Sequence, residues 1–381
     1  MHFYTKNVHF PNKENAHEVS KTKPIYQTSA FSFTDFDDME NYFDGDKAYL
    51  YTRMGNPNSD DLGKGVAELE GAEMGVASAA GLSAILAGVL AVAKTGDHIL
   101  ATQDLYGGTW SMFSNDLKDF GIEVSFIDME DRGAIESAIK ENTVMLYSES
   151  ITNPLLRVED IEGLAKIASA NKLYLMIDNT FATPYLIRPH EVGADIVAHS
   201  ATKYIGGHSD VTAGVVSGSK ELMTKAKGKV SMLGSNIGPF DAWLSVRGLK
   251  TLSVRMAKQC ENAEALAKAL NSQPGIAKVY YPKAASQTGN GAVVTIELEE
   301  DVDIMEFSKN LGWIKVVPTL AGLETSVTYP VATSHRPLPE ETREKLGVTK
   351  QMIRISVGIE DERDIIDTFS EALVRTKAPS L

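Results

Sequence analysis

Cysteine is nearly absent from this chain of 381 residues, in which Cys260 is the only one. A single cysteine cannot form an intrachain disulfide, so the sequence suits a reducing compartment and we expect a cytoplasmic protein. Positive charge is also in the minority, because 37 Lys and Arg stand against 51 Asp and Glu, a formal net charge of −14. That balance argues against nucleic acid and against an anionic membrane surface as partners.

Long apolar runs and several common ligand motifs are missing as well. The uncharged segment 77–93 is shorter than the ~20 residues of a membrane span and rich in small residues, so it predicts a buried helix. The first twenty residues are polar and lack the apolar core of a signal peptide. No G-x-G-x-x-G, no P-loop and no His or Cys pair at metal-ligand spacing occurs. The sequence therefore predicts neither a membrane protein nor a metal site.

Strand and helix patterns alternate from residue 60 to residue 217. Apolar runs typical of strands occupy residues 75–79, 98–102, 123–127, 144–148, 173–177, 196–198 and 212–217. Helical patterns lie between them at 60–70, 81–94, 109–120, 131–140 and 161–170, with Asp131 as an N-cap. This alternation predicts an α/β fold with a mainly parallel, doubly wound sheet and helices on both of its faces.

The pattern changes after Pro239. One long helical stretch, 242–270, is followed by shorter strands at 279–281, 293–298, 314–317 and 353–357 and by helices at 304–311 and 362–375. We therefore expect an N-terminal arm that contacts a neighbouring subunit (residues 1–59), a large cofactor-binding domain (60–249) and a smaller α+β C-terminal domain (250–381).

Reactive side chains follow two of the predicted strands at the point where each strand ends. The strand at 173–177 is followed by Asp178, and the strand at 196–198 by Ser200, Thr202 and Lys203. Because parallel strands end at the same edge of a sheet, these groups should meet there. An amine for an aldehyde, a carboxylate for a pyridine nitrogen and hydroxyls for a phosphate suit pyridoxal phosphate. The pairing predicts that cofactor and, with it, the chemistry of amino acids.

Four further positions could complete such a site. Gly81, at the start of a helix, would let backbone N–H groups approach an anion, and Tyr106, beside two glycines, could lie flat against a planar cofactor. Arg53 could bind phosphate, and Arg354 could bind a substrate carboxylate from the far face of a half-buried strand. Taken singly, each also fits an ordinary turn or a surface charge.

A different enzyme class shares part of this pattern. Ser200-Ala-Thr-Lys203 fits the S-x-x-K signature of penicillin-binding proteins and β-lactamases, and Lys94-Thr95-Gly96 supplies a K-T-G. In those enzymes, however, K-T-G follows S-x-x-K on a strand, whereas here it precedes it at a helix end, and no S-D-N occurs. The order of the motifs disfavours acyl transfer.

Seven motifs occur together in order. They are Tyr51-Thr-Arg-x-x-Asn-Pro57, Ala80-Gly81, Tyr106-Gly-Gly-Thr109, Asn153-Pro154, Asp178-Asn-Thr180, Ser200-Ala-Thr-Lys-Tyr204 with Gly207-His208, and Arg354-x-Ser-Val-Gly358. From about Pro24 onward the chain resembles the Cys/Met-metabolism family of pyridoxal-phosphate enzymes, which includes cystathionine γ-synthase, cystathionine β- and γ-lyases, methionine γ-lyase and acylhomoserine sulfhydrylases. The resemblance implies the type I pyridoxal-phosphate-dependent transferase fold and a homotetramer of two catalytic dimers.

The resemblance also implies roles for individual residues. Lys203 would bind the cofactor's aldehyde and move protons at Cα and Cβ, Asp178 would keep the pyridine nitrogen protonated, and Tyr106 would stack on the ring and assist the leaving group. The phosphate would be held by Gly81, Leu82, Ser200 and Thr202 of one chain and by Tyr51 and Arg53 of the neighbour. The substrate carboxylate would be bound by Arg354, Asn153 and the main chain near Thr319.

Three positions bear on which reaction the chain would catalyse. Pro318 stands where cystathionine-handling members commonly carry a glutamate, although the nearby Glu324 could supply that charge. Gly108 stands where methionine γ-lyases typically carry a cysteine. We predict γ-elimination from methionine, homocysteine or cystathionine, giving 2-oxobutyrate, ammonia and a thiol. The alternatives are a γ-replacement synthase using acylated homoserine, a cystathionine β-lyase giving pyruvate, and a non-catalytic cofactor-binding protein, which would not need a carboxylate clamp.

Overall fold

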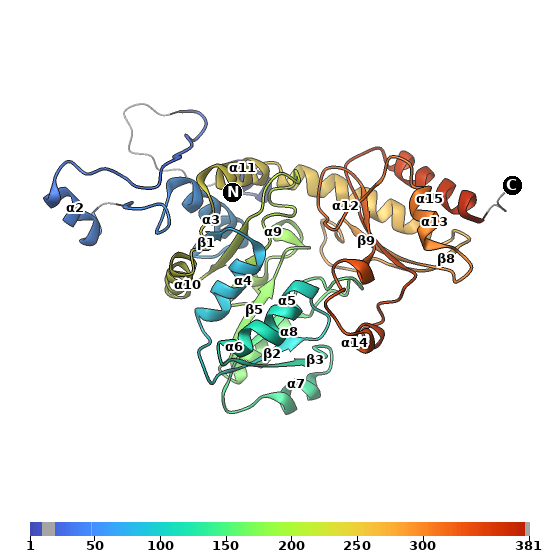
Figure 1. Ribbon diagram of the computed structural model, residues 1–381, viewed down its shortest axis with the longest axis horizontal. Coiled ribbons are helices and arrows are strands. Elements are labelled where there is room, and N and C mark those ends of the chain that lie inside the picture. The colour runs from blue at the N-terminus through green and yellow to red at the C-terminus, as the bar shows by residue number, and fades with distance from the viewer. Residues whose placement is uncertain (10–19, 47, 378–381) are drawn as a thin grey trace.

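The computed structural model describes residues 1–9, 20–46 and 48–377. Two β-sheets form the body, and the long helix α12 (Leu252–Leu270) runs between them (Figure 1). Helix α2 (Phe36–Phe43) lies on an extended segment that projects from the body. Both α2 and the short helix α1 (Phe3–Val8) fall within residues 1–59, the predicted N-terminal arm, for which no helix was predicted.

The larger sheet has seven strands in the order β1-β7-β6-β5-β4-β2-β3. The bounds are β1 (Met74–Ser78), β2 (His98–Thr102), β3 (Glu123–Ile127), β4 (Thr143–Glu149), β5 (Tyr174–Asp178), β6 (Ile196–His199) and β7 (Gly214–Gly218). Strands β3, β2, β4, β5 and β6 run parallel, and β7 is antiparallel to both β6 and β1. The predicted mainly parallel α/β fold is confirmed, and β7, next to the edge strand β1, runs opposite to the other strands of this sheet.

Helices cover both faces of this sheet. Their bounds are α3 (Pro57–Glu70), α4 (Gly81–Leu90), α5 (Gly107–Ser111), the π-helical turn η1 (Met112–Asp116), α6 (Leu117–Asp119), α7 (Arg132–Ala138), α8 (Ile161–Ala170), α9 (Thr183–Leu186), the 3-10 turn η2 (Pro189–Val192) and α10 (Lys220–Met232). Neighbouring strand residues separate accordingly: Ile99 belongs to the hydrophobic cluster that includes α4 and α10, whereas Leu100 belongs to the cluster that includes α7 and α8. Helix α4 is buried, as its apolar sequence predicted, and Asp131 caps α7.

The predicted single helix over 242–270 is wrong, because α11 (Pro239–Leu249) ends before α12 begins. The buried Asn7 satisfies the backbone at this break: its Nδ2 donates to Leu249 O at 2.5 Å, and its Oδ1 accepts from Ser253 N at 2.9 Å. The Arg255 guanidinium also donates to Gly248 O at 2.8 Å. Side chains distant in sequence therefore stabilise a break that local helix propensity does not reveal.

The second sheet has five strands in the order β10-β11-β12-β9-β8. It comprises β8 (Ile276–Tyr280), β9 (Val293–Leu298), β10 (Lys315–Val316), β11 (Ser326–Thr328) and β12 (Met352–Ser356), with helices α13 (Ile304–Lys309), α14 (Glu340–Lys345) and α15 (Glu362–Lys377) and the 3-10 turn η3 (Pro330–Ala332). The short strand β11 was not predicted. All of β12 is buried, so the expectation of a half-buried strand is wrong. Ile353 and Ile355 face the core beside α15. Arg354 faces the opposite way, into a cavity between the two sheets.

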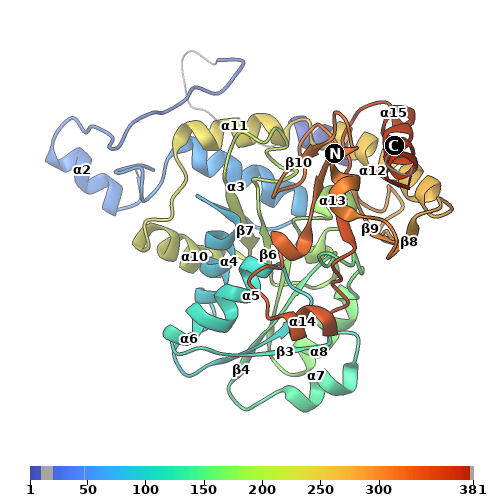
Figure 2. The same cartoon turned by 45° about the vertical axis from the view of Figure 1, so that its right-hand side comes forward.

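The segment before α14 packs against the larger sheet's helix α5, although it belongs to the part of the chain that forms the second sheet. Figure 2 shows it reaching from the second sheet toward α5, and Ser334 O lies close against Gly107.

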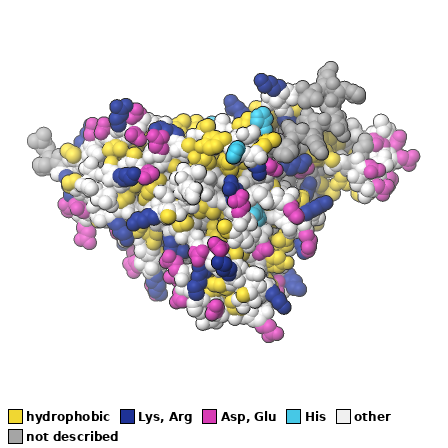
Figure 3. All heavy atoms as spheres, turned by 180° about the vertical axis from the view of Figure 1, so that it is seen from behind, with side chains coloured by type: hydrophobic (Ala, Val, Ile, Leu, Met, Phe, Trp, Pro, Cys, Tyr) yellow, Lys and Arg dark blue, Asp and Glu magenta, His cyan; other side chains and the backbone are white. Residues whose placement is uncertain are grey.

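On the face seen in Figure 3, acidic and basic side chains are interspersed. In the described ranges, no helix is both long enough and apolar enough to cross a membrane. The proposed division into an arm and two domains stays a prediction.

Removal of the Asn7 side chain tests the account of the break. Asn7→Ala leaves a buried carbonyl and a buried N–H without their partner, so we expect the free energy of unfolding to fall by about 2 kcal/mol. Denaturant titration measures it, with Thr5→Ala, an exposed position of the same helix, as the control. Equal stability of the two variants would contradict the role given to Asn7.

Candidate active site

A cavity of about 540 Å³ opens where β4, β5 and β6 end. It is closed from the other side by β12 and by segments near residues 318–320 and 332–334. Nine of the predicted site residues line it: Gly81, Leu82, Tyr106, Asn153, Asp178, Ser200, Thr202, Lys203 and Arg354. The structure thus brings residues from six separate motifs into one place.

Asp178 lies at the end of β5 and is held by Thr180. The backbone N and the hydroxyl of Thr180 donate to Asp178 Oδ1 at 2.9 and 2.5 Å. Burial raises the pKa of Asp178, and these two hydrogen bonds oppose the rise. Ser200 N in turn donates to Thr180 Oγ1 at 2.8 Å, so the ends of β5 and β6 are tied together on the cavity side.

Glu149 is a site residue that the sequence analysis missed. It ends β4 in register with Asp178, so two carboxyl groups stand side by side at the floor of the cavity. Its Oε1 accepts from Tyr106 N at 2.7 Å. Burial, followed by repulsion from Asp178, holds the pKa of Glu149 well above its usual range. The only signal in the sequence was an acid that ends an apolar strand four residues before Asn153.

The Lys203 amine is partly buried, and its surroundings lower its pKa. Its Nζ donates to Thr319 Oγ1 at 2.7 Å, which places the Thr319 side chain beside the amine. Burial, and then the nearby Arg354 cation, lower the pKa of Lys203 to about 8. An amine with such a pKa is a better nucleophile near neutral pH than an ordinary lysine.

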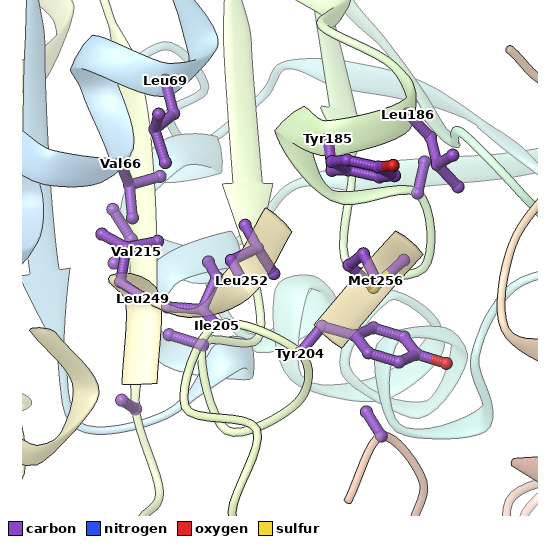
Figure 4. Close-up of a cluster of buried hydrophobic side chains, with 14 of the residues drawn as sticks. Val66, Leu69, Tyr185, Leu186, Tyr204, Ile205, Val215, Leu249, Leu252 and Met256 are labelled. Carbon is purple, nitrogen blue, oxygen red and sulfur yellow. The ribbon is translucent and has the colours of Figure 1, made fainter. Parts of the chain in front are cut away.

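The turn after Lys203 is rigidly packed. Tyr204 and Ile205 belong to a buried cluster with Leu252 and Met256 of α12 (Figure 4). The Arg255 guanidinium donates to Tyr204 O at 2.8 Å and to Ile205 O at 3.4 Å. The backbone that carries the amine is therefore fixed by the core on one side of the cavity.

Arg354 is a buried cation whose charge the protein does not neutralise. Its side chain donates to Asn153 Oδ1 at 3.0 Å and to Thr328 Oγ1 at 3.4 Å, while its Nε has no partner. No acid among the described residues forms an ion pair with it, and burial lowers its pKa to about 10. A buried guanidinium of this kind is suited to binding a carboxylate ligand. His335 Nε2 bonds to Asn153 O at 2.9 Å and so holds the residue beside it.

The start of α4 offers a site for an anion. The first N–H groups of a helix have no partner within it, and here the Ser83 hydroxyl bonds to both N and O of Ala80. A Cβ on Gly81 would lie 2.6 Å from Ser200 Cβ, so only glycine allows this approach. The Thr202 hydroxyl donates to Ala213 O at 3.1 Å and accepts from Ala213 N at 2.9 Å, which fixes its orientation at the cavity wall.

Two glycines allow Tyr106 to lie over the cavity. A Cβ on Gly107 would stand 1.9 Å from Ser334 O, and one on Gly108 would stand 2.5 Å from the Tyr106 ring. The ring is 43% exposed and lines the cavity. The lining residues that the sequence analysis did not name as site residues are Ala80, Ile85, Glu149, Ile151, Thr180, Phe181, Thr212, Pro318, Leu320, Ala332, Thr333 and Ser334.

Three residues considered from the sequence lie outside the cavity. Arg53 donates to Ser231 O at 3.1 Å and stands 5.7 Å from the Tyr51 ring. That Tyr51 and Arg53 reach the site of a neighbouring chain stays a prediction. Glu324 pairs with Lys315 at 2.8 Å on the surface and does not line the cavity, so it does not supply an acid in place of Pro318.

The residues present fit pyridoxal phosphate. Lys203 offers an amine of lowered pKa to the aldehyde, Asp178 offers a carboxylate to the ring nitrogen, and the start of α4 with Ser200 offers donors to the phosphate. The volume suits a cofactor together with a small substrate. Arg354 remains for the substrate's carboxylate.

Comparisons with known proteins agree with this assignment. The family model described as Cys/Met metabolism PLP-dependent enzyme matches residues 4–374. A cystathionine β-lyase of Lactococcus lactis subsp. cremoris is 39% identical over 92% of this chain and 93% of its own, and an L-methionine γ-lyase of Fusobacterium nucleatum subsp. polymorphum is 39% identical over 92% of each chain. A solved cystathionine γ-synthase from Xanthomonas oryzae pv. oryzae, in complex with aminoacrylate and cysteine, superposes with a TM-score of 0.93 at 32% identity over 99% of each chain.

These matches cover nearly the whole chain and confirm the predicted family, fold and cofactor, while they span several reactions on sulfur amino acids. The chain belongs to the pyridoxal-phosphate-dependent enzymes of Cys/Met metabolism, with the fold of the type I pyridoxal-phosphate enzymes.

Proposed function

We propose that the protein eliminates the γ-substituent of a sulfur amino acid, namely methionine, homocysteine or cystathionine, and releases 2-oxobutyrate, ammonia and a thiol. The observation that carries the proposal is the pairing, within one cavity, of the unneutralised Arg354 cation with the Lys203 amine. The first suits the α-carboxylate of an amino acid, and the second suits proton transfer at carbons next to it.

Each group of the chain then has a defined task. Pyridoxal phosphate, when bound, supplies an electron sink for the negative charge that develops at Cα. Arg354 and Asn153 hold the substrate carboxylate, which fixes the direction of the Cα–H bond. Lys203 removes the Cα proton and later transfers protons at Cβ, for which a pKa of about 8 is well matched near neutral pH. The Tyr106 hydroxyl donates a proton as the γ-thiolate leaves, and water releases the keto acid and ammonia.

Asp178 serves the same reaction from the floor of the cavity. Its carboxylate keeps a proton on the ring nitrogen, which the electron sink requires, and Thr180 holds that carboxylate in place by two hydrogen bonds. The raised pKa of Glu149 disfavours a second negative charge beside Asp178. It also anchors Tyr106 through the backbone.

The wall that faces the distal end of the substrate supports a small or apolar γ-substituent. The described acids of the cavity, Glu149 and Asp178, both lie at its floor, and Pro318 supplies no charge. γ-Replacement on an acylated homoserine and β-elimination from cystathionine use the same carboxylate clamp and amine, and proteins of both kinds are among the relatives. A homo-oligomer with shared sites is proposed with the function, because Tyr51 and Arg53 stay outside the cavity of their own chain.

Product analysis tests the proposed reaction. The cofactor-loaded protein is incubated separately with methionine, homocysteine and cystathionine, and the keto acids are separated. We expect 2-oxobutyrate, because loss of a γ-substituent leaves a four-carbon chain. A Lys203→Ala variant is the control and should form none. Pyruvate from cystathionine, or a keto-acid-free mixture that reacts only after acylhomoserine and a thiol are added, would contradict γ-elimination.

Pro318→Glu tests the role of the distal wall. A carboxylate there can pair with the distal ammonium of cystathionine, so we expect the ratio of kcat/KM for cystathionine over methionine to rise about tenfold, the effect of one charge-assisted hydrogen bond of ~1.4 kcal/mol. Pro318→Gln is the matched control, since it changes the shape without adding charge. The same ratio in both variants would show that charge at this position does not select the substrate.

The pH dependence of Lys203 labelling tests its lowered pKa. In protein freed of cofactor, a lysine-reactive reagent should modify Lys203 with a midpoint near pH 8, because the reactive free amine forms above its pKa. Lys166 is the internal control, as its hydrogen bond to Glu162 raises its pKa above the ordinary lysine value. Peptide mass mapping quantifies both. A shared midpoint for the two residues would contradict the environment described for Lys203.

A further inference from the structure

A buried polar cluster lies on the side of the strand ends away from the cavity. Asp178 and Ala198 pair in register, so the next residues, Asn179 and His199, send their side chains to the other side. Both meet Glu70, the last residue of α3: Asn179 Nδ2 donates to Glu70 Oε1 at 2.8 Å, and His199 Nε2 lies 2.6 Å from the same oxygen. The three side chains are 0%, 0% and 1% exposed for Glu70, Asn179 and His199, respectively.

Stability alone does not account for this cluster. Glu70 Oε2, Asn179 Oδ1 and His199 Nδ1 are buried without a partner in the described part of the chain. Buried polar groups with unmade hydrogen bonds cost free energy, and apolar side chains of similar volume would often serve stability as well or better.

The cluster lies where β5 and β6 end. Asn179 directly follows Asp178, and His199 directly precedes Ser200. Asn179 N also donates to Ala198 O at 2.8 Å, and its Nδ2 to Ile187 O at 2.8 Å. One carboxylate oxygen of Glu70 therefore contacts the ends of both strands on the side away from the cavity. On the cavity side, the Thr180 hydroxyl connects the same two strand ends through its bond to Ser200 N.

His199 of this cluster also acts on the pKa of Asp178. Burial raises the pKa of Asp178, and among the groups that oppose this rise are the hydrogen bonds of Thr180 and the neighbouring His199. A His199 held by Glu70 thus favours the ionised form of Asp178, which is the form that faces a protonated ring nitrogen.

We propose that Glu70, Asn179 and His199 are positioning residues for pyridoxal phosphate. By holding the residue after Asp178 and the residue before Ser200 from one oxygen, Glu70 fixes the spacing between the carboxylate for the ring nitrogen and the hydroxyl for the phosphate. None of the three side chains touches the cavity. The inference concerns cofactor binding alone, so it holds whichever sulfur amino acid is the substrate, and its test requires no turnover.

The test compares two substitutions of Glu70. Glu70→Ala removes both hydrogen bonds, and we expect the dissociation constant of pyridoxal phosphate to rise about tenfold or more, the order seen when groups that orient metal ligands are lost. The induced circular dichroism of the bound cofactor should weaken as well. Glu70→Gln keeps an oxygen that accepts from both partners, so its dissociation constant should stay within about threefold of the natural value. Stripped protein is titrated with the cofactor, and absorbance is followed.

His98→Ala is the control for Glu70→Ala, because it also removes two hydrogen bonds of a buried side chain but lies away from the cavity. His98 is fully buried at the start of β2, at the opposite edge of the sheet, and bonds to Thr143 Oγ1 and Ser125 Oγ at 2.8 and 2.9 Å. Its substitution should lower the unfolding temperature and leave cofactor binding unchanged. If Glu70→Ala does not fold, Asn179→Ala, which removes one of the two hydrogen bonds, takes its place. A cofactor affinity in the Glu70 or Asn179 variant equal to that of His98→Ala would overturn the proposal.

Discussion

The in-register pairing of β4, β5 and β6 is the constraint on which the rest of the site depends. It brings Glu149 level with Asp178 and sets Asp178 beside Ala198, from which the chain turns to Ser200 and Lys203. A shift of one residue in either pair would send these side chains to the opposite face of the sheet. The parallel arrangement also requires helices on both faces, so each strand is buried and its end is fixed by packing. The rigidity of the cofactor site is thus a property of the sheet rather than of the loops that surround it.

Charges that the protein leaves unneutralised define what the cavity can bind. Burial of the Lys203 amine, and then its repulsion from the buried Arg354 guanidinium, lower the pKa of the amine. At the floor, burial of Glu149, and then its repulsion from Asp178, raise the pKa of Glu149. Placing like charges side by side in a buried site is costly, so the arrangement favours ligands that carry the opposite charges: a carboxylate at one end and a protonated ring nitrogen at the other.

The sequence predicted what local patterns determine and missed what distant contacts determine. Strand ends follow from apolar runs, so the positions of Asp178 and Lys203 at one edge could be predicted, as could the family from its ordered motifs. The break between α11 and α12 could not, because it depends on Asn7, about 240 positions away in the sequence. Strand β11 is only three residues long, and Glu149 is a single acid without a motif of its own. The placement of Tyr51 and Arg53 relative to a second chain lies beyond what one chain specifies.

The proposed site is divided between the sheet and the loops. The groups that bind the cofactor and the α-carboxylate stand at strand ends or on buried strands, where a change of position would disturb the core. The distal wall, in contrast, is built from Pro318 and from residues 332–334, which lie between strands or in a short turn. Substitutions there alter the charge next to the γ-substituent and leave the sheet intact. Under the proposed function, the fold fixes the groups that act at Cα, and this wall is the part of the site that faces the bond farther along the substrate.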